Sequence, residues 1–557
     1  MTHVVTQSCC NDASCVTVCP VNCIHPTPDE AGYATAEMLF IDPAACIDCG
    51  ACLDICPVGA IDADYDLTEE NDAFRDLAAR FFQGPTAPAY VPRRADRPLS
   101  RASQGAGALR VAVIGSGPAG AFATEYLLDS GADVTIDLFE RLPVPWGLTR
   151  FGVAPDHPRT KQIADIFERI ADDPRCRLVL GVEIGRDIAL SELEATYDAV
   201  IVATGALADR ALGIPGEDLR GSHSATEFAG WYNGHPDFAD RRFNLDTERA
   251  VVIGNGNVAL DVARVLASDV DALRHTDIAD HALDALAASR VREVVVVGRR
   301  GPADAAFTAP ELLGLAASRA FSLRVDLPAD TAAPLLSGQG PQGWAGAEKA
   351  GILHRLARQA PLPGRPLRLV FQRSPVELIG EQTVSAVRFA RNRIEVGPDG
   401  RAAAVATGEQ DLFEAGLVLR SIGYAGSAIA GMPFNDRTRT VPSAGGRVID
   451  PATGDARPKL YVAGWIRRGP SGSMGSNRAC ARETVAALLD DHRAGRLAAG
   501  GPMPESLAAT ITRSAGLADW RSIDRHERAQ GRLAGRPRVK LVDRHAMARI
   551  GAQGTPR

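Results

Sequence analysis

The stretch RVAVIGSGPAG at residues 110–120 decides the fold of the larger part of this chain. A β-branched run leads into G-x-G-x-x-G at Gly115, Gly117 and Gly120, and an Ala-rich helical pattern follows. Glycines at this spacing allow a tight turn and let a pyrophosphate approach the next helix N-terminus. The strand-like VTIDLFE then ends at Glu140, where a carboxylate can accept from a ribose 2′-hydroxyl. The segment predicts a dinucleotide site; the alternative is a structural glycine turn.

A second copy of this unit, AVVIGNGNVALDVAR, carries Gly254, Gly256 and Ala259 in the G-x-G-x-x-A form. Its matching strand, VREVVVVGRRG, ends in Arg299 and Arg300 rather than in an acid. Two guanidiniums suit the extra 2′-phosphate of NADP, although arginines at a strand end are also common on protein surfaces. An acid after the first turn and arginines after the second predict FAD at the first and NADP at the second.

Cysteine is concentrated near the N-terminus, where nine of the 11 residues lie within the first 56 positions. No basic and apolar leader precedes them, which favours a metal site in a cytoplasmic, bacterial-type protein over a disulfide framework. The spacing C-x2-C-x2-C-x3-C, followed by Pro57, is the run that ligates iron–sulfur clusters. It consists of Cys46, Cys49, Cys52 and Cys56. Three consecutive sulfurs reach one cluster, and the fourth reaches another.

An upstream copy, CCNDASCVTVCP, has the spacing C-x2-D-x2-C-x3-C, with Asp12 in place of the second cysteine. Together the two runs resemble the bacterial two-cluster ferredoxins over about 70 residues. The resemblance implies a [4Fe–4S] cluster on Cys19, Cys46, Cys49 and Cys52, and a second cluster on Cys9, Cys15 and Cys56. Because of Asp12, the second cluster is either [3Fe–4S], or [4Fe–4S] with a carboxylate or water on one iron. Cys10 and Cys23 are interpreted as spare thiols, and a zinc ribbon is the alternative.

Charge and composition exclude several function classes. Residues 1–76 hold 14 acidic residues and one basic residue, a net charge of −13, whereas the rest of the chain carries +6. This asymmetry predicts electrostatic docking between the two parts or with a basic partner. An acidic head and only 5% aromatic residues argue against nucleic-acid binding. No apolar run is long enough for a membrane span, so membrane insertion is not expected.

Further motifs narrow the family. PVPWGLTRFGVAPDHP (143–158) and GWIRRGPSGSMGSN (464–477) resemble the adrenodoxin-reductase family of ferredoxin–NADP reductases, over about residues 109–545. With the head attached, the whole chain resembles the actinobacterial ferredoxin/ferredoxin–NADP reductase fusion proteins. The resemblance implies FAD contacts from Gly115, Gly117, Ala119, Gly120, Glu140, Leu148, Ile184, Trp465, Gly472, Ser473 and Met474. It implies NADP contacts from Arg210, Asn255, Gly256, Asn257, Val258, Arg299, Arg300, Glu311 and Gly472.

The same resemblance places His157 and Asp261 near the junction of flavin and nicotinamide, although His157 could equally be a structural loop residue. The chain departs from the family at Ser473-Met474, where Val-Ile is usual, and at Gly314, where some members carry a carboxylate. Backbone contacts can survive the first change. The second removes one group that could handle a proton near the nicotinamide.

The expected fold is an α+β ferredoxin-like head with two clusters, followed by two α/β Rossmann-like domains. The boundaries are 1–76 for the head, 77–108 for a linker, 109–205 and 422–557 for the FAD domain and its tail, and 206–421 for an inserted NADP domain. The expected activity passes electrons between NADPH and a protein acceptor, such as a separate ferredoxin, a cytochrome or a P450 system. Two alternatives are a subunit resembling the glutamate-synthase β subunit, and a non-enzymatic redox sensor.

Overall fold

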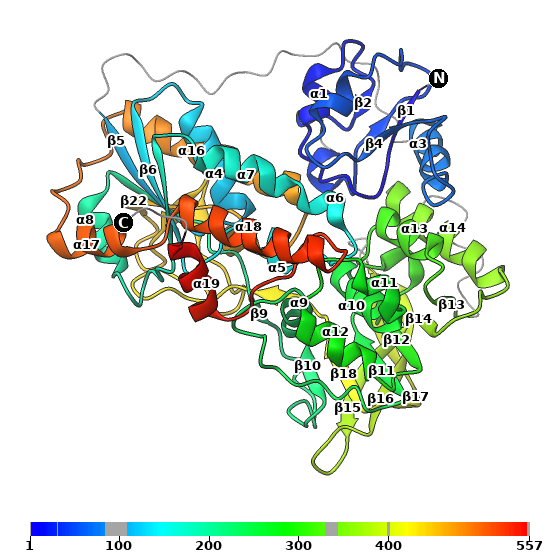
Figure 1. Ribbon diagram of the computed structural model, residues 1–557. Helices are drawn as coiled ribbons and strands as arrows, with labels where there is room; N and C mark the ends of the chain where they lie inside the picture. Colours follow the sequence, from blue (N-terminus) through cyan, green and yellow to red (C-terminus); the bar gives the residue numbers. More distant parts are fainter. Residues whose placement is uncertain (1, 31, 84–107, 329–342, 398–401, 554–557) are drawn as a thin grey trace.

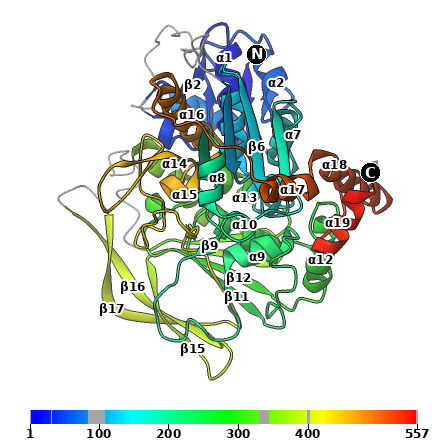
Figure 2. The same cartoon turned by 90° about the vertical axis from the view of Figure 1, so that its left-hand side faces the viewer.

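A computed structural model describes residues 2–30, 32–83, 108–328, 343–397 and 402–553 of the chain (Figure 1). It contains a small N-terminal head, residues 2–83, and a body, residues 108–553, that is built around two separate large sheets. The head lies at one end of the molecule, and an antiparallel meander projects from the opposite end (Figure 2). Among the described residues, no helix has the length and apolarity that a membrane crossing would need.

The head consists of two small antiparallel sheets and three helices. Its elements are β1 (His3–Val5), α1 (Ser14–Val18), β2 (Ile24–His25), the 3-10 turn η1 (Tyr33–Thr35), β3 (Phe40–Ile41), α2 (Ala51–Ile55), β4 (Ile61–Ala63) and α3 (Ala73–Gln83). Strand β1 pairs with β4, and β2 pairs with β3. Helices α1 and α2 end at Cys19 and Cys56, because each cysteine precedes a proline and is held extended.

Helix α3 shows that the predicted linker over residues 77–108 begins too early. Phe74 and Leu77 are buried on one face of this helix, and Phe81 stacks on Phe40 with ring centroids 4.2 Å apart. The helical spacing of these apolar residues lets α3 cover the head, so the helix belongs to it. Most of the remaining linker prediction, residues 84–107, lies outside the described residues.

The first sheet of the body has seven strands in the order β20-β21-β22-β8-β5-β6-β7. These are β5 (Leu109–Ile114), β6 (Val134–Glu140), β7 (Cys176–Leu180), β8 (Ala199–Val202), β20 (Ser443–Ala444), β21 (Arg447–Ile449) and β22 (Ala456–Val462). Strands β22, β8, β5, β6 and β7 are parallel. The continuous apolar runs of β8 and of residues 111–114 in β5 are typical of strands covered on both faces.

Helices pack around this first sheet. They are α4 (Pro118–Leu128), α5 (Leu148–Phe151), α6 (Pro158–Lys161), α7 (Ile163–Ala171), α8 (Leu190–Thr196), α15 (Trp465–Arg468), α16 (Met474–Arg493), α17 (Glu505–Arg513), α18 (Leu517–Leu533) and α19 (Arg544–Ala552). The C-terminal helices α17 to α19 share the core of this sheet, since Ile511, Trp520 and Met547 are buried in it. The tail therefore has no separate core.

The second sheet has six parallel strands in the order β10-β18-β11-β12-β14-β13. These are β10 (Ser222–Ser224), β11 (Arg249–Ile253), β12 (Glu293–Val297), β13 (Ser322–Asp326), β14 (Pro366–Val370) and β18 (Leu417–Arg420). Its helices are α9 (Ala225–Tyr232), α10 (Asn257–Ala267), α11 (Val270–Arg274), α12 (Asp280–Ala287), α13 (Ala309–Ala317) and α14 (Gly343–Arg358), with the 3-10 turn η2 (Pro302–Asp304).

Two smaller sheets complete the body. The meander is β15 (Arg373–Ile379), β16 (Ala386–Val396) and β17 (Ala402–Glu414), and a short pair is β9 (Ala208–Asp209) with β19 (Tyr424–Ala425). The head is not a separate globule, because its core is continuous with the core of the second sheet. Cys10, Val58 and Ala60 of the head also join the core around the first sheet.

Candidate functional site

The first glycine turn connects β5 to α4, as the sequence predicts. Gly115 has φ +103°, and a Cβ there would lie 2.6 Å from the carbonyl oxygen of Ala203 at the end of β8. A Cβ on Gly120 would lie 1.8 Å from the Gly115 carbonyl oxygen. Gly117, at the N-cap of α4, has open space around it. The glycines thus bring strand and helix together and leave the helix N-terminus accessible to a phosphate.

Glu140 ends β6 beside this turn, at the position expected for a ribose ligand. Its Oε2 accepts hydrogen bonds from the Ser116 hydroxyl at 2.8 Å and the Ser116 backbone N–H at 3.2 Å. Two buried indole N–H groups, of Trp146 and Trp465, have no hydrogen-bond partner among the described residues. Buried donors without partners are costly, so both groups fit a site that a polar ligand completes.

The other residues predicted to contact FAD lie on neighbouring segments. A Cβ on Gly464, which precedes α15 and Trp465, would lie 2.6 Å from the Cβ of Ala119 in α4. Leu148 begins α5, and Gly472 to Met474 lead into α16. Ile184 is buried with Ile466 of α15 in a hydrophobic core of the first sheet that is separate from the core around Trp520.

The second glycine turn repeats the first between β11 and α10. Gly254 has φ +114°, and a Cβ there would lie 2.1 Å from the Ser421 carbonyl oxygen. The Asn257 side chain accepts from the Thr308 backbone N–H at 2.9 Å, and the Asn255 carbonyl accepts from the Phe307 N–H at 2.8 Å. The two asparagines therefore fix the loop before α13 against the turn.

Arg299 and Arg300 follow β12 at the carboxyl edge of the second sheet. Within the described part of the chain, no carboxylate lies at ion-pair distance from either guanidinium, so both are free to bind an anion. Arg210 is exposed after β9, and its backbone N–H donates to the Gly423 carbonyl at 3.3 Å. Val258 packs at the edge of the core on the first turn of α10.

Three titratable side chains come together between α6, α10 and α13: His157, Asp261 and Glu311. A ring nitrogen of His157 and one carboxylate oxygen of each acid all lie within 4.8 Å of one another. Burial lowers the pKa of His157, with a further contribution from the nearby Arg264 cation. Burial raises the pKa of Asp261 to about 6, and it also raises the pKa of Glu311. Burial thus disfavours the charged form of each of these three groups.

Arg264 holds this cluster in place, and sequence reasoning missed it. Its guanidinium donates to Asp156 at 2.7 and 3.0 Å and to Asp261 at 2.8 Å. Burial by itself would raise the pKa of Asp156, but Arg264 outweighs it and lowers that pKa to about 2. Because Arg264 lies one turn after Asp261 on α10, its helical spacing was the available signal.

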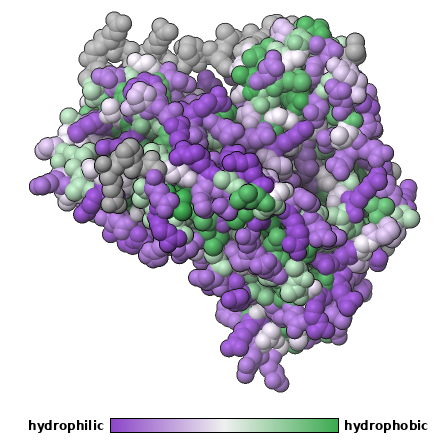
Figure 3. Space-filling view, in the orientation of Figure 1, coloured by the Kyte–Doolittle hydropathy of each residue, from purple (hydrophilic) through white to green (hydrophobic). Residues whose placement is uncertain are grey.

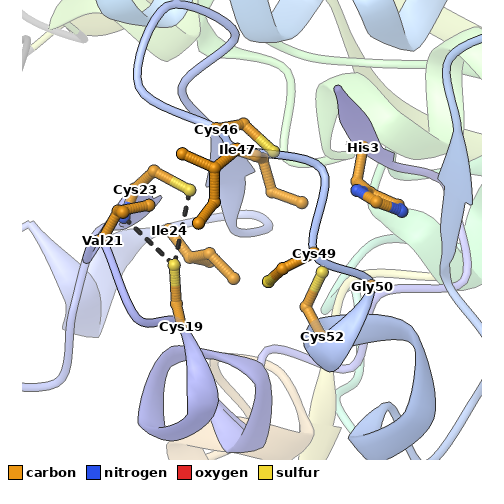
Figure 4. Close-up of a pocket in the computed structure, with 11 residues that line it drawn as sticks. His3, Cys19, Val21, Cys23, Ile24, Cys46, Ile47, Cys49, Gly50 and Cys52 are labelled. Carbon is orange, nitrogen blue, oxygen red and sulfur yellow. Dashed lines mark hydrogen bonds between the residues drawn. The ribbon is translucent and has the colours of Figure 1, made fainter. Parts of the chain in front are cut away.

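The cysteines predicted to share one cluster line a single pocket in the head (Figure 4). These are Cys19, Cys46, Cys49 and Cys52. Cys23 lines the same pocket, with its sulfur 3.4 Å from that of Cys19, so the spare thiol lies beside the predicted ligand set. Hydrogen bonding from Cys23 lowers the pKa of Cys19 below its usual value, which favours the thiolate that a metal requires.

The second predicted set, Cys9, Cys15 and Cys56, lies where the head meets the body. Burial raises the pKa of Cys9 to about 11 and that of Cys15 well above its usual value, and each thiol is close enough to Cys56 and Asp12 to feel their charges. Thiols gathered in this way fit a metal-cluster site, because a bound metal replaces the thiol protons.

Asp12, in contrast, has partners within the protein. It accepts from the Ser14 hydroxyl and from the Cys10 thiol, whose sulfur lies 3.6 Å from Oδ1, and it pairs with Arg478 of α16. The ion pair joins Arg478 Nη1 to Asp12 Oδ2 at 3.7 Å. Both carboxylate oxygens are therefore engaged by other groups.

The head contacts the body through charges of opposite sign. Among the described residues, five ion pairs cross the contact: Asp12–Arg478, Glu37–Lys349, Asp62–Arg159, Glu69–Arg319 and Arg80–Glu348. In four of them the acid belongs to the head. The predicted docking between an acidic head and a basic body is thus present, although the charge count could not name the residues that carry it.

The head also caps two helices of the body. The Gly475 N–H, in the first turn of α16, donates to the Cys10 carbonyl at 3.0 Å. The Ala309 N–H, at the start of α13, donates to the Glu37 carboxylate at 2.7 Å. Backbone N–H groups in the first turn of a helix have no acceptor within the helix. One capped helix packs around each large sheet, so the head bridges the two sheets.

Comparisons with known proteins agree with this arrangement. Residues 109–296 match the family model for pyridine nucleotide-disulphide oxidoreductases, and residues 39–62 match the 4Fe-4S binding domain. A probable ferredoxin/ferredoxin–NADP reductase of Mycobacterium tuberculosis is 46% identical, covering 98% of this chain and 94% of that protein. The related protein of Mycobacterium leprae is 43% identical over all of this chain and 99% of its own length.

A shorter relative matches the body without the head. NADPH-ferredoxin reductase FprA of Mycobacterium tuberculosis is 43% identical and covers 79% of this chain and 98% of its own length. The solved structure of that protein in complex with NADPH has a TM-score of 0.74 and 42% identity, over 80% of this chain and 100% of the other. The full-length likeness and the matched cysteine run agree with a Rossmann-type reductase body that carries an iron–sulfur head. The chain belongs to the ferredoxin/ferredoxin–NADP reductase family of oxidoreductases.

Proposed function

We propose that this chain passes electrons between NADPH and a separate protein through FAD in the body and two iron–sulfur clusters in the head. FAD, when bound, supplies the conversion of a two-electron hydride into single electrons, which the clusters can carry. The observation that carries the proposal is the hydrogen bond between the Gly475 N–H and the Cys10 carbonyl. It joins the cysteine loop of the head to the helix that begins at the proposed FAD residues 472–474.

The proposed FAD domain comprises residues 109–205 and 422–557, with the NADP domain, residues 206–421, inserted between them. In support, β8 and β22 are hydrogen-bonded neighbours, although all six strands of the second sheet come between them in sequence. The first glycine turn and Glu140, with the unpaired indole N–H groups nearby, are suited to FAD. The second turn, with the unpaired Arg299 and Arg300, is suited to NADP. The FAD and NADP contacts implied by the resemblance are proposed at the same residues.

His157 and Asp261 are the proposed proton-handling residues. Their ring nitrogen and carboxylate lie within one small cluster with Glu311, which is itself a proposed NADP contact. The neutral His157 ring can accept or donate a hydrogen bond, and Asp261 changes its charge near pH 6. Arg264 keeps both groups oriented through Asp156 and Asp261. The pair can therefore hold and release a proton without leaving the site.

The two cysteine sets would act in series. Cys9, Cys15 and Cys56 pack where the head meets the body, so the cluster they hold is proposed to exchange electrons with the flavin. Because Asp12 is engaged by Ser14, Cys10 and Arg478, three thiolates remain, which favours [3Fe–4S] at this site. The four thiols of Cys19, Cys46, Cys49 and Cys52, which lie at the pocket in Figure 4, favour [4Fe–4S]. Electrons are proposed to pass between the two sets, since the charge of Cys52 acts on Cys15.

The outer face of the head is the proposed contact for the protein acceptor, a ferredoxin, a cytochrome or a P450 system. Cys49 is exposed, and Ile47 beside it is 58% exposed. Hydrophobic residues gather over the head on a surface that is otherwise mainly hydrophilic (Figure 3). Exposed apolar residues next to a cluster ligand suit transient contact with another redox protein. The thiolate sets require reducing conditions, as in the cytoplasm.

Anaerobic titration of the full-length protein with NADPH tests the proposal. We expect flavin bleaching in the visible spectrum first and cluster bleaching afterwards. Electron paramagnetic resonance should show a [3Fe–4S] signal in the oxidised protein, which disappears on reduction. Reduction of the flavin without any reduction of the clusters would contradict the proposed path.

A further inference from the structure

Gln7 of the head reaches into the nicotinamide side of the body. It lies two residues after β1, and its side-chain Nε2 donates to the Glu311 Oε2 at 2.8 Å. The same nitrogen lies 3.5 Å from Nε2 of His157. A residue from the iron–sulfur head is therefore hydrogen-bonded to one member of the proton-handling cluster and adjacent to another.

Position 314 makes room for this side chain. A Cβ on Gly314 would lie 2.1 Å from Oε1 of Gln7, 2.3 Å from its Cδ and 2.4 Å from its Nε2. Gly314 lies within α13 and does not have a positive φ, so the backbone does not require glycine there. Glycine inside a helix is less favourable than alanine. Glycine is needed at position 314 because the Gln7 amide occupies the space that a Cβ would take there.

The docked head fixes Gln7 at this place. Glu37 of the head binds the Ala309 N–H at the start of α13 and also pairs with Lys349 of α14 at 3.2 Å. Glu311 follows Ala309 within the same first turn. The head therefore contacts the first turn of α13 twice, through Glu37 and through Gln7, and both contacts are absent if the head moves away.

We propose that Gln7 is a positioning residue of the nicotinamide site, supplied by the head, and that Gly314 is the opening that admits it. The inference rests on the proposed function, which places Glu311 at the nicotinamide. Gln7 binds one carboxylate oxygen of Glu311 and leaves the other for a ligand. Burial, opposed by Arg264 and by the Gln7 hydrogen bond, raises the pKa of Glu311, so without Gln7 this carboxylate is less well stabilised.

Binding of two ligands distinguishes a role of Gln7 in positioning the nicotinamide site from a general loss of nucleotide binding. NADP⁺ carries the nicotinamide, whereas 2′,5′-ADP carries only the phosphates and adenosine that Arg299 and Arg300 are proposed to bind. In the full-length holoprotein, Gln7→Ala should raise the Kd for NADP⁺ by about three- to tenfold, because a hydrogen bond to a charged group is lost. The Kd for 2′,5′-ADP should stay unchanged. Equal changes for both ligands, or none for NADP⁺, would overturn the proposal.

Gly314→Ala supplies an independent variant, because its methyl group displaces the Gln7 amide. We expect the same selective loss of NADP⁺ affinity, and we expect the double variant to lose no more than either single one, since both remove one interaction. Additive losses would overturn the proposal. Gly351→Ala is the matched control: Gly351 also lies inside a helix, α14, with only the end of Arg355 within 4 Å of an added Cβ, and it should leave both affinities unchanged.

Hydrogen exchange at the Gly475 amide shows whether Gln7 acts at the nicotinamide site or only by keeping the head docked. That N–H depends on the Cys10 carbonyl of the head, so it is protected only while the head is docked. Gln7→Ala should retain this protection while NADP⁺ affinity falls. Loss of protection in Gln7→Ala would show that Gln7 acts through docking and would overturn its positioning role. An unprotected Gly475 in the wild type would instead contradict the proposed electron path.

Discussion

Arg478 of α16 and Asp12 of the head form an ion pair across the contact between body and head, with Nη1 and Oδ2 3.7 Å apart. The body holds Arg478 rigidly, because its Nη2 pairs with Glu125 at 3.1 Å and its guanidinium lies 5.0 Å from the ring centroid of Phe122. A guanidinium fixed by an aromatic ring and a carboxylate presents its remaining donors in one direction. The body thus offers a preset positive charge to the head, beside the second set of cysteines.

Replacing Arg478 with Gln should loosen this contact while keeping most of the side-chain stem. We expect cluster reduction by NADPH to slow by about fivefold, since one partly buried ion pair contributes about 1 kcal/mol. Stopped-flow absorption should show flavin bleaching at an unchanged rate. Arg493→Gln is the control, because Arg493 lies on the same helix and, within the described part of the chain, pairs with Asp490 of that helix alone. Equal rates of cluster reduction in the wild type, Arg478→Gln and Arg493→Gln would show that the ion pair does not support docking.

The cofactor preference depends on Arg299 and Arg300. Changing both to Ala should raise the KM for NADPH about ten- to a hundredfold, because each charge-assisted contact to the 2′-phosphate contributes roughly 1.5–3 kcal/mol. The KM for NADH, which lacks this phosphate, should change little. Arg292→Ala, an exposed arginine at the opposite end of β12, should affect neither. Similar losses with both nucleotides would argue against NADP at the second glycine turn.

Local spacing was sufficient to predict the two glycine turns and the metal-binding run from Cys46 to Cys56, whereas the place of Cys19 beside that run came from the family resemblance. Gly115, Gly254 and the Cys46–Cys56 run act over short distances, so their chemistry is visible in consecutive residues. Gln7 and Glu311 could not be matched in this way, because 304 positions separate them and only docking brings them together. The sequence did contain one indirect signal, the unusual Gly314, but its meaning depends on the side chain that fills the space.

Boundaries and shared cores were harder to predict for a similar reason. The linker prediction covers residues 77–108, although α3 continues to Gln83. The apolar face of α3 packs on β1 and β3 of the head and reaches Trp344 of the body, which packs against both Phe40 and Phe81. Tertiary packing, rather than local propensity, fixes that helix.

Asp261→Asn should stabilise the protein above about pH 6 and have no effect near pH 4. Burial raises the pKa of Asp261 to about 6, so the folded protein disfavours the charged form. Protonated Asp261 stabilises the folded protein. This contribution is fully present below the pKa that Asp261 has in the unfolded chain, and it is lost as the pH rises through its pKa in the folded protein. At about pH 8 the gain should be about 1–3 kcal/mol, seen as a higher unfolding midpoint. Asp271→Asn, an exposed acid of α11, should show no such pH dependence. A gain that grew toward acidic pH would contradict this sign.

Asp12→Cys tests the type of the second cluster. A fourth thiolate at this corner should convert [3Fe–4S] to [4Fe–4S], so the electron paramagnetic resonance signal of the oxidised protein should disappear. Asp12→Asn is the matched variant, and it should retain the wild-type signal, because Asp12 is engaged by Ser14 and Arg478 rather than by iron. If Asp12→Asn itself altered the cluster signal, the carboxylate would be a ligand after all.

Separating head from body tests whether electrons must leave through the head. The relative FprA corresponds to the body alone, so a chain lacking residues 1–104 should fold. It should keep NADPH–ferricyanide activity, because a small acceptor can reach the flavin directly, and it should lose most cytochrome reduction. The head added in trans should restore cytochrome reduction only at high concentration, since tethering normally supplies an effective concentration on the order of millimolar. Full cytochrome activity in the truncated chain would show that the head is not the obligatory exit.

The same assay ranks the contacts that hold the head. Glu37 is mostly buried and binds both Lys349 and the Ala309 N–H, so Glu37→Gln in the added head should weaken reconstitution by about tenfold or more. Glu69→Gln is the matched control, because its pair with Arg319 is exposed and should contribute about twofold or less. Raising the salt from about 0.05 M to about 0.5 M should weaken the wild-type head markedly, as screening shortens the reach of its charges. Salt should weaken the Glu37→Gln head by about the same factor, because a buried ion pair is screened little and the exposed pairs remain in this variant. Loss of the salt dependence in the Glu37→Gln head would mean that Glu37, and not the exposed pairs, guides the docking.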